Sequence, residues 1–143
     1  QYEIQPAYLW PVHPVHHRYA PRLRSFLLRP AKEVLTDENF FSEYKGAFTE
    51  QFVAQELIAN KETLYYYSKE NSTLELDFLV QKDVVYPIEV KAEENVKSKS
   101  LKTVYDADHA LCPVRFSMLG YKKQEWMENV PLYASMEYIR SKE

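Results

Sequence analysis

The chain has 143 residues, of which 45% are apolar, 27% charged and 15% aromatic, and its formal net charge is −3. This length suits one domain of roughly 100–150 residues, and the apolar fraction is too high for a disordered chain. No apolar run approaches the ~18 residues that a membrane-spanning helix needs, and a single cysteine excludes an internal disulfide framework. We therefore expect a folded cytoplasmic domain that makes no membrane contact.

Glycine is scarce, since Gly46 and Gly120 are the only two in the sequence. The G-x-x-x-x-G-K-[ST] and G-x-G-x-x-G loops each need several glycines close together, so the chain binds no nucleotide through either loop. The chain begins with Gln1 rather than Met, and on this ground we expect it to be part of a longer protein.

Charge and proline are distributed unevenly along the chain. Residues 1–31 carry four arginines, one acid and five of the eight prolines, whereas residues 32–143 carry 14 basic and 20 acidic residues. The prolines predict an irregular N-terminal arm over 1–31, followed by one folded domain over 32–143. The arm is a candidate for contact with a partner protein or with a second copy of the chain.

The hydrophobic pattern predicts an alternation of helices and strands in the folded domain. Helical spacing extends from 40 to 60, and a second helix is predicted over 99–111. The predicted strands are 64–68, 74–81, 84–91, 114–119 and 130–134, with a short helix at the C-terminus. The order helix, three strands, helix, strand predicts an α/β domain in which helices flank a mixed β-sheet.

Two neighbouring strands bring polar residues to one face of the predicted sheet. The strands 74–81 and 84–91 are close enough in sequence to form an antiparallel hairpin, and their apolar residues must be buried on one side. Any register that satisfies this condition places Asp77, Glu89 and Lys91 together on the opposite face.

The register determines how close the two acids lie. If Gln81 pairs with Val85, Asp77 lies directly across from Glu89, with the Cβ atoms roughly 5 Å apart. Two carboxylates at this separation repel each other unless a cation lies between them or one of them is protonated. The hairpin therefore predicts either a cation site or an ion network.

The first helix adds a third acid, Glu50. At 100° per residue, Glu50 shares its helix face with small and apolar residues, namely Gly46, Ala47, Val53, Ala54 and Leu57. An uncompensated carboxylate on such a face costs several kcal/mol. Mg²⁺ or Mn²⁺ shared with Asp77 and Glu89 would compensate it, and Lys91 could polarise a water or stabilise charge on a phosphate.

Sequence segments around these residues resemble a known superfamily. ELDFL at 75–79 followed by PIEVK at 87–91 resembles the PD-(D/E)XK nucleases. The first acid, the twelve-residue step and the E-x-K motif of these enzymes are matched by Asp77, Glu89 and Lys91. Glu50 matches the acid that the superfamily often carries on its first helix.

A narrower resemblance covers about residues 32–135. It rests on three segments and on the tail VPLY at 130–133; the segments are 44–57 (YKGAFTEQFVAQEL), 65–80 (YYYSKENSTLELDFLV) and 87–101 (PIEVKAEENVKSKSL). They look like the restriction-endonuclease-like C-terminal domain of unknown function found on bacterial and archaeal AAA-type ATPases. The resemblance implies a restriction-endonuclease-like core and an ATPase domain elsewhere in the full-length protein. Residues 1–31 depart from this pattern.

Two functions from different classes follow. The first is a divalent-metal-dependent phosphodiesterase acting on DNA or RNA, in which Glu50, Asp77 and Glu89 hold the metal and Lys91 activates water or stabilises the developing charge. The second is a catalytically silent module that docks a partner or nucleic acid, in which the same residues form an ion network. The function therefore depends on the geometry of these four side chains.

Two further features lead to expectations. Four lysines form a basic strip that could follow phosphates, although a solvated surface is the simpler interpretation; they are Lys91, Lys97, Lys99 and Lys102. Cys112 precedes a proline and has no adjacent catalytic dyad, so we expect a buried structural thiol.

Overall fold

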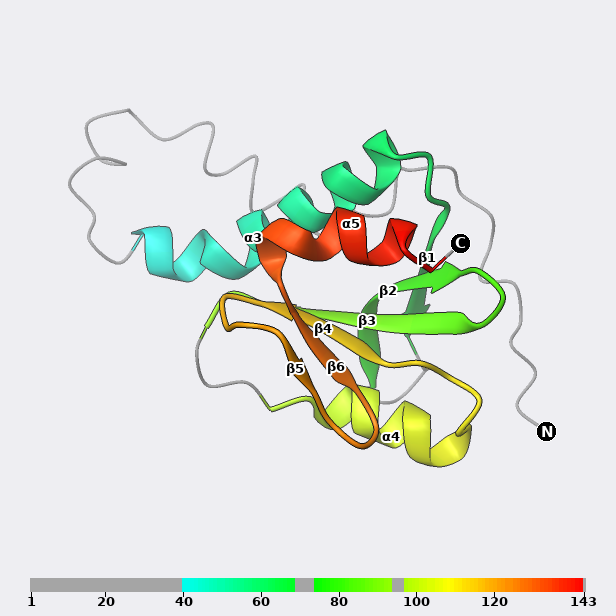
Figure 1. Ribbon diagram of the computed structural model, residues 1–143. Coiled ribbons are helices and arrows are strands. Elements are labelled where there is room, and N and C mark those ends of the chain that lie inside the picture. The colour runs from blue at the N-terminus through cyan, green and yellow to red at the C-terminus, as the bar shows by residue number, and fades with distance from the viewer. Residues whose placement is uncertain (1–39, 69–73, 94–96, 143) are drawn as a thin grey trace.

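The computed structural model describes residues 40–68, 74–93 and 97–142. Within these residues a six-stranded mixed sheet carries helices on both of its faces (Figure 1). The predicted arm over 1–31 lies outside the described residues. No helix in the described part of the chain combines the length and the apolarity needed to cross a bilayer.

The elements follow one another in the predicted order of helix, three strands, helix and strand. The first half consists of α3 (Phe40–Ala59), β1 (Leu64–Ser68), β2 (Glu75–Gln81) and β3 (Val85–Lys91). The second half consists of α4 (Lys99–Ala107), β4 (Val114–Ser117), β5 (Lys122–Lys123), β6 (Glu128–Pro131), a 3-10 helix (Leu132–Ala134) and α5 (Ser135–Arg140). The prediction of an α/β domain with a mixed sheet is thus confirmed for this part of the chain.

The sheet combines an antiparallel half with a parallel half, in the strand order β1-β2-β3-β4-β6-β5. β2 and β3 form the expected antiparallel hairpin, and Gln81 pairs with Val85, which confirms the predicted register. β3, β4 and β6 run parallel to one another. Their C-terminal ends therefore meet at one end of the sheet, where Lys91 pairs with Ser117 and Ser117 with Pro131.

One face of the sheet packs against α3 and α5 and forms the main core (Figure 1). The strands contribute alternating apolar residues, namely Phe78, Val80, Tyr86, Ile88, Val90, Val114, Phe116 and Val130. From α3, the predicted apolar face supplies Val53, Ala54 and Leu57, all of them buried. Burying a side chain the size of Leu57 is worth about 1.5–3 kcal/mol, so this face accounts for much of the stability of the domain.

The opposite face is more polar and is covered by α4 (Figure 1). Leu101 is the one buried residue of this helix. Beneath and beside α4 lie four buried polar or charged side chains of the sheet: Glu89, Arg115, Ser117 and Asn129. Asp77 and Glu89 alternate with Phe78 and Ile88 along their strands, so they point to this side and away from α3.

Several element ends differ from the prediction. β4, predicted over 114–119, ends at Ser117, and β6, predicted to begin at 130, begins at Glu128. α4 ends at Ala107 rather than at 111, because Asp108 is extended and its side chain accepts a hydrogen bond from the Ala110 N–H at 2.9 Å. An Asp side chain that bonds the backbone in this way competes with the helix. The strand predicted over 130–134 ends at Pro131, and a 3-10 helix replaces its second half.

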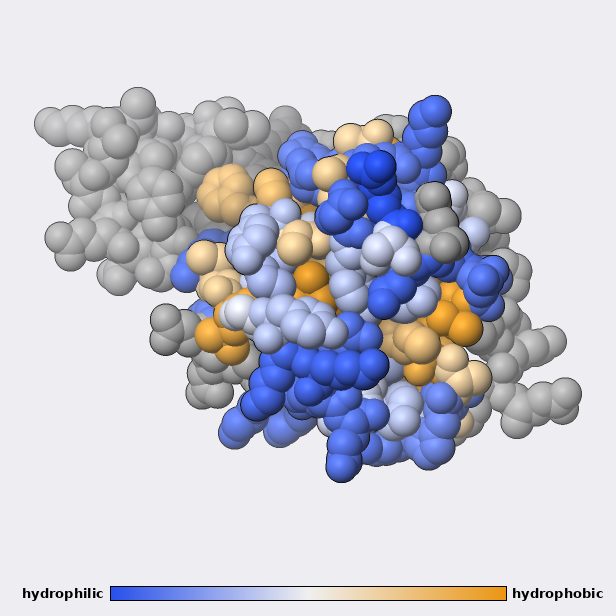
Figure 2. Space-filling model, viewed as in Figure 1, coloured by the Kyte–Doolittle hydropathy of each residue, from blue (hydrophilic) through white to orange (hydrophobic). Residues whose placement is uncertain are grey.

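Two further expectations were incomplete or wrong. The two-residue strand β5 was not predicted, because a Lys-Lys pair carries no apolar alternation. Both lysines are exposed, and Figure 2 shows hydrophilic side chains over this edge, as is typical of edge strands protected against unwanted pairing. The thiol of Cys112 is exposed, not buried. Only its backbone is anchored, through an N–H that donates to the Val85 carbonyl at 3.0 Å.

Candidate active site

The open end of the β2–β3 hairpin positions Asp77. The last paired residues of the ladder are Phe78 and Ile88, so one step further along the same register Asp77 lies opposite Glu89. The Asp77 carboxylate accepts a hydrogen bond from the backbone N–H of Val90 at 2.7 Å. Its side chain thus ties β2 to β3 beyond the last paired residues, and the two predicted acids are brought together.

Glu89 is a buried carboxylate with only one of its oxygens engaged. Glu89 Oε1 lies 2.9 Å from the Lys91 ammonium, and the Glu89 side chain is 10% exposed against 36% for Lys91. Glu89 Oε2 is buried and has no hydrogen-bond partner among the residues that the structure describes. A buried polar atom left unsatisfied costs about 1–3 kcal/mol, and more when the group is charged. Such an atom is suited to bind a cation or to accept a hydrogen bond from a bound ligand.

A buried arginine on the neighbouring strand faces the same region. Arg115 pairs with Glu89 in the parallel register and is 6% exposed. Its Nε donates to Asn129 Oδ1 at 2.8 Å, and its Nη1 donates to Ser98 Oγ at 3.3 Å. Burial lowers the pKa of Arg115, and the negative charge of Glu89 acts in the opposite direction. The fold therefore supplies Glu89 with a second positive neighbour besides Lys91.

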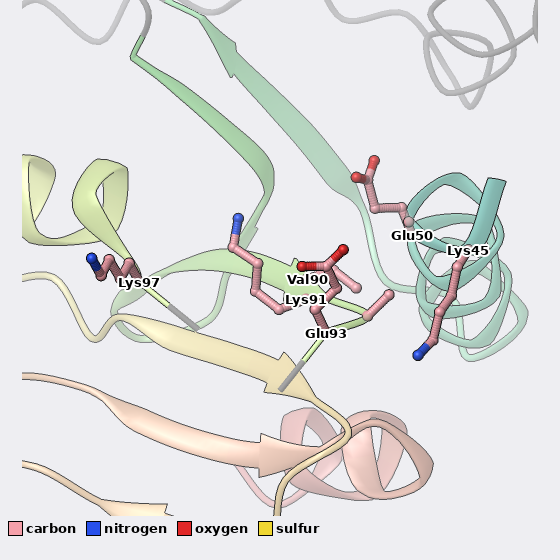
Figure 3. A pocket seen from close by; sticks show the side chains of 8 residues that line it. Lys45, Glu50, Val90, Lys91, Glu93 and Lys97 are labelled. Atoms are coloured by element: carbon pink, nitrogen blue, oxygen red, sulfur yellow. The ribbon is translucent and has the colours of Figure 1, made fainter. Parts of the chain in front are cut away.

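Glu50 reaches this end of the sheet from the other side. An open hollow lies between α3 and the end of β3, and the side chains around it include Lys45, Glu50, Val90, Lys91, Glu93 and Lys97 (Figure 3). In Figure 3 the Glu50 carboxylate extends from α3 on the side of the helix that faces Lys91 and Glu93. Lys91 therefore belongs both to the hollow and to the ion pair with Glu89.

The structure brings the predicted residues together in two groups rather than in one. Asp77, Glu89 and Lys91 form one group, and Glu50 and Lys91 share the hollow. Within the described ranges, no three His, Cys, Asp or Glu side chains are clustered as a ready-made metal site. The reason is that α3 packs on the sheet face opposite to the two strand acids. The role of Glu50 as a metal ligand stays a prediction.

Two carboxylates nevertheless fit a hard divalent cation. Mg²⁺ is commonly bound in proteins by one or two carboxylates, with water and substrate phosphate as its remaining ligands. Asp77 and Glu89 match that set, because they are adjacent and Glu89 Oε2 is not engaged by any described residue. The donor set therefore fits Mg²⁺ or Mn²⁺ without a third acid.

A comparison with protein families places the chain. A family model described as a domain of unknown function, DUF4143, matches residues 45–136, which is more than half of the chain. The chain belongs to the DUF4143 family. No curated protein and no solved structure gives a significant match to it. The matched range of the DUF4143 domain contains all four predicted site residues, and it runs from α3 into α5.

Sequence reasoning missed three residues of this DUF4143 site. Arg115 lies in a strand that was predicted only from its apolar neighbours, and Asn129 lies just before the predicted start of another strand. No sequence pattern indicated Lys45, because it lines the same hollow as Lys91 only through the packing of α3 on β3. The one visible hint was a charged residue, Arg115, flanked by Val114 and Phe116 inside a strand.

Proposed function

We propose that this DUF4143 domain is a restriction-endonuclease-like, divalent-metal-dependent phosphodiesterase that acts on DNA or RNA. We further propose that it forms part of a longer protein with an AAA-type ATPase domain. The observation that carries the proposal is the buried, unsatisfied Glu89 Oε2 beside Asp77 at the open end of a hairpin. The order of elements and the E-x-K spacing, which resemble those of the PD-(D/E)XK nucleases, support it.

The chain's own groups have separable roles in this proposal. Asp77 and Glu89 are the residues that would hold the metal, and the bound ion would supply an activated water and neutralise charge on the phosphate. The Val90 N–H keeps Asp77 oriented before any substrate binds. Lys91 is partly exposed and lines the hollow, so its ammonium can stabilise the negative charge that develops on the phosphate oxygens.

Calorimetric titration of the purified chain with Mn²⁺ tests the metal site. We expect the wild type to bind Mn²⁺ and the double variant Asp77→Asn with Glu89→Gln to lose binding. Glu62→Gln is the matched control, because the Glu62 side chain is 9% exposed and pairs with Lys82 at 2.7 Å, away from the site. Wild-type protein that binds no Mn²⁺ at millimolar concentration would overturn the proposal and leave the docking module as the better interpretation.

A cleavage assay then tests the chemistry. Single-stranded DNA, duplex DNA and RNA are incubated with Mg²⁺ and with the wild type or Lys91→Gln. We expect cleavage of at least one substrate by the wild type, and a loss of about 10²-fold or more in Lys91→Gln with Mn²⁺ binding retained. Metal binding without cleavage of any of the three substrates would contradict the proposed activity.

A further inference from the structure

Two lysines flank Lys91 at the hollow and come from different parts of the chain. Lys45 projects from α3, and Lys97 immediately precedes the N-cap of α4 (Figure 3). Both are exposed, and neither forms an ion pair with another residue that the structure describes. Two unpaired ammonium groups at one hollow are suited to bind an anion.

Other lysines of the domain behave differently. Lys82 pairs with Glu62, and Lys102 pairs with Asp106 one helical turn away. At the hollow, by contrast, Glu50 and Glu93 also line the walls, and no ion pair joins either of them to Lys45 or Lys97. The hollow thus keeps two positive charges available at the end of the sheet where the candidate site lies.

The start of α4 adds to this positive potential. Its first turn contains no acidic residue, and Ser98 at the N-cap makes no capping hydrogen bond with its side chain. The Ser98 hydroxyl oxygen instead accepts from Arg115. The first N–H groups of a helix have no partner within the helix and carry partial positive charge, so they favour a nearby anion. The partial positive charge at the start of α4 thus adds to the charge of the two lysines, which carry the inference.

We propose that the hollow binds the backbone of a nucleic-acid strand, with Lys45 and Lys97 each contacting a phosphate, one on either side of Lys91. The inference rests on the proposed function for the identity of the substrate. Its binding step is electrostatic and needs no metal. A strand laid along the end of the sheet then passes Lys91 and the pair of Asp77 and Glu89.

Fluorescence anisotropy with a labelled oligodeoxythymidylate, in EDTA and at several salt concentrations, measures this contact in the full chain. Each phosphate contact contributes about 0.7 to the slope of log K against log salt for a single strand. We therefore expect the double variant Lys45→Gln with Lys97→Gln to lower the slope by about 1.4 and to weaken low-salt binding by about tenfold.

The matched control is Lys122→Gln with Lys123→Gln, which removes the same charge from exposed lysines on the far edge strand β5. The control should keep the wild-type slope. Equal slopes for the wild type and the Lys45/Lys97 variant, an equal loss in the control, or no binding of the strand by the wild type would each overturn the inference. Strand binding that depends on Lys45 and Lys97 in a protein that fails to bind Mn²⁺ would support this inference while overturning the proposed function.

Discussion

Buried polar side chains on the α4 face of the sheet differ in how completely they are satisfied. Asn129 Oδ1 accepts hydrogen bonds from Arg115 Nε and Ser117 Oγ, and Asn129 Nδ2 donates to the Gly120 carbonyl at 2.9 Å. Glu89 Oε2, on the same face, has no such partner among the described residues; Gln51 Oε1 on α3 is the other buried side-chain atom left in that state. The unsatisfied oxygen of Glu89 therefore belongs to a residue that would bind the metal in the proposed function.

Tyr138 should make the stability of the folded protein depend on pH in the alkaline range. Burial, followed by the negative charge of Glu128, raises the pKa of Tyr138 above its usual 10.0. The folded protein therefore holds this proton more tightly than the unfolded chain. The contribution of protonated Tyr138 to stability is fully present below about pH 10 and is lost as the pH rises toward the folded pKa. We expect urea denaturation to show a smaller loss of stability above about pH 10 in Tyr138→Phe than in the wild type.

The control for this prediction is Tyr133→Phe, since Tyr133 is 86% exposed. It should reproduce the wild-type dependence on pH. Burial also raises the pKa of Tyr86, so Tyr138→Phe is expected to reduce the alkaline loss rather than to abolish it. Parallel curves for the wild type and Tyr138→Phe would contradict the assignment.

The helices are anchored to the sheet to different extents. α3 contacts β3, β1 and α5 and buries three apolar side chains in the main core, including Leu57. α4 buries Leu101 alone, and its surface pair between Lys102 and Asp106 is of a kind that contributes little. We therefore expect α4 to open more readily than α3, although its N-terminal end holds Ser98 against Arg115.

Truncation of one fully buried leucine in each helix tests this difference. Leu101→Ala and Leu57→Ala should each cost about 2–5 kcal/mol of local or global stability. In hydrogen exchange, we expect Leu101→Ala to raise exchange mainly in α4, because few other contacts hold that helix. Leu57→Ala should raise exchange in α3 and in the sheet together. Indistinguishable exchange patterns for the two variants would show that α4 is not a separate unit.

The whole molecule places its candidate site where three parallel strands end. β3, β4 and β6 finish side by side, and open α/β sheets commonly bind ligands outside the carboxyl ends of such strands. α3 and the start of α4 approach this end from opposite faces, so residues from distant parts of the chain surround it (Figure 1). A ligand that spans this end of the sheet would contact both helical layers and should stabilise the fold as a unit.

The effect of Mn²⁺ on the thermal stability of the whole domain tests the metal site at Asp77 and Glu89. A cation that binds only the folded state adds about 2.7 kcal/mol at a hundredfold excess over its Kd. We expect Mn²⁺ to raise the Tm of the wild type and of Glu62→Gln relative to EDTA. No such rise is expected in Asp77→Asn with Glu89→Gln. An equal rise in that double variant would mean that the ion binds elsewhere.

Much of the local structure was predictable, because it depends on periodicity within short segments. Alternation in 74–81 and 84–91 predicted the hairpin, and the need to bury both apolar sets predicted the pairing of Gln81 with Val85. The helix over 40–60 was predicted to within one residue. Element ends were less predictable, since the end of α4 depends on a single hydrogen bond that the Asp108 side chain accepts from the Ala110 N–H.

The amino-acid sequence by itself determined most of the order of elements, the register of the hairpin and the placement of Asp77 opposite Glu89. These follow from side-chain alternation and from the need to bury apolar residues, both of which act over a few residues. Only the tertiary structure decided that Glu50 does not form a ready-made metal cluster with the two strand acids, that Arg115 is buried beside Glu89, and that Lys45 and Lys97 line one hollow. Those relations depend on which face of the sheet each helix covers, and close packing of the complete core sets that choice.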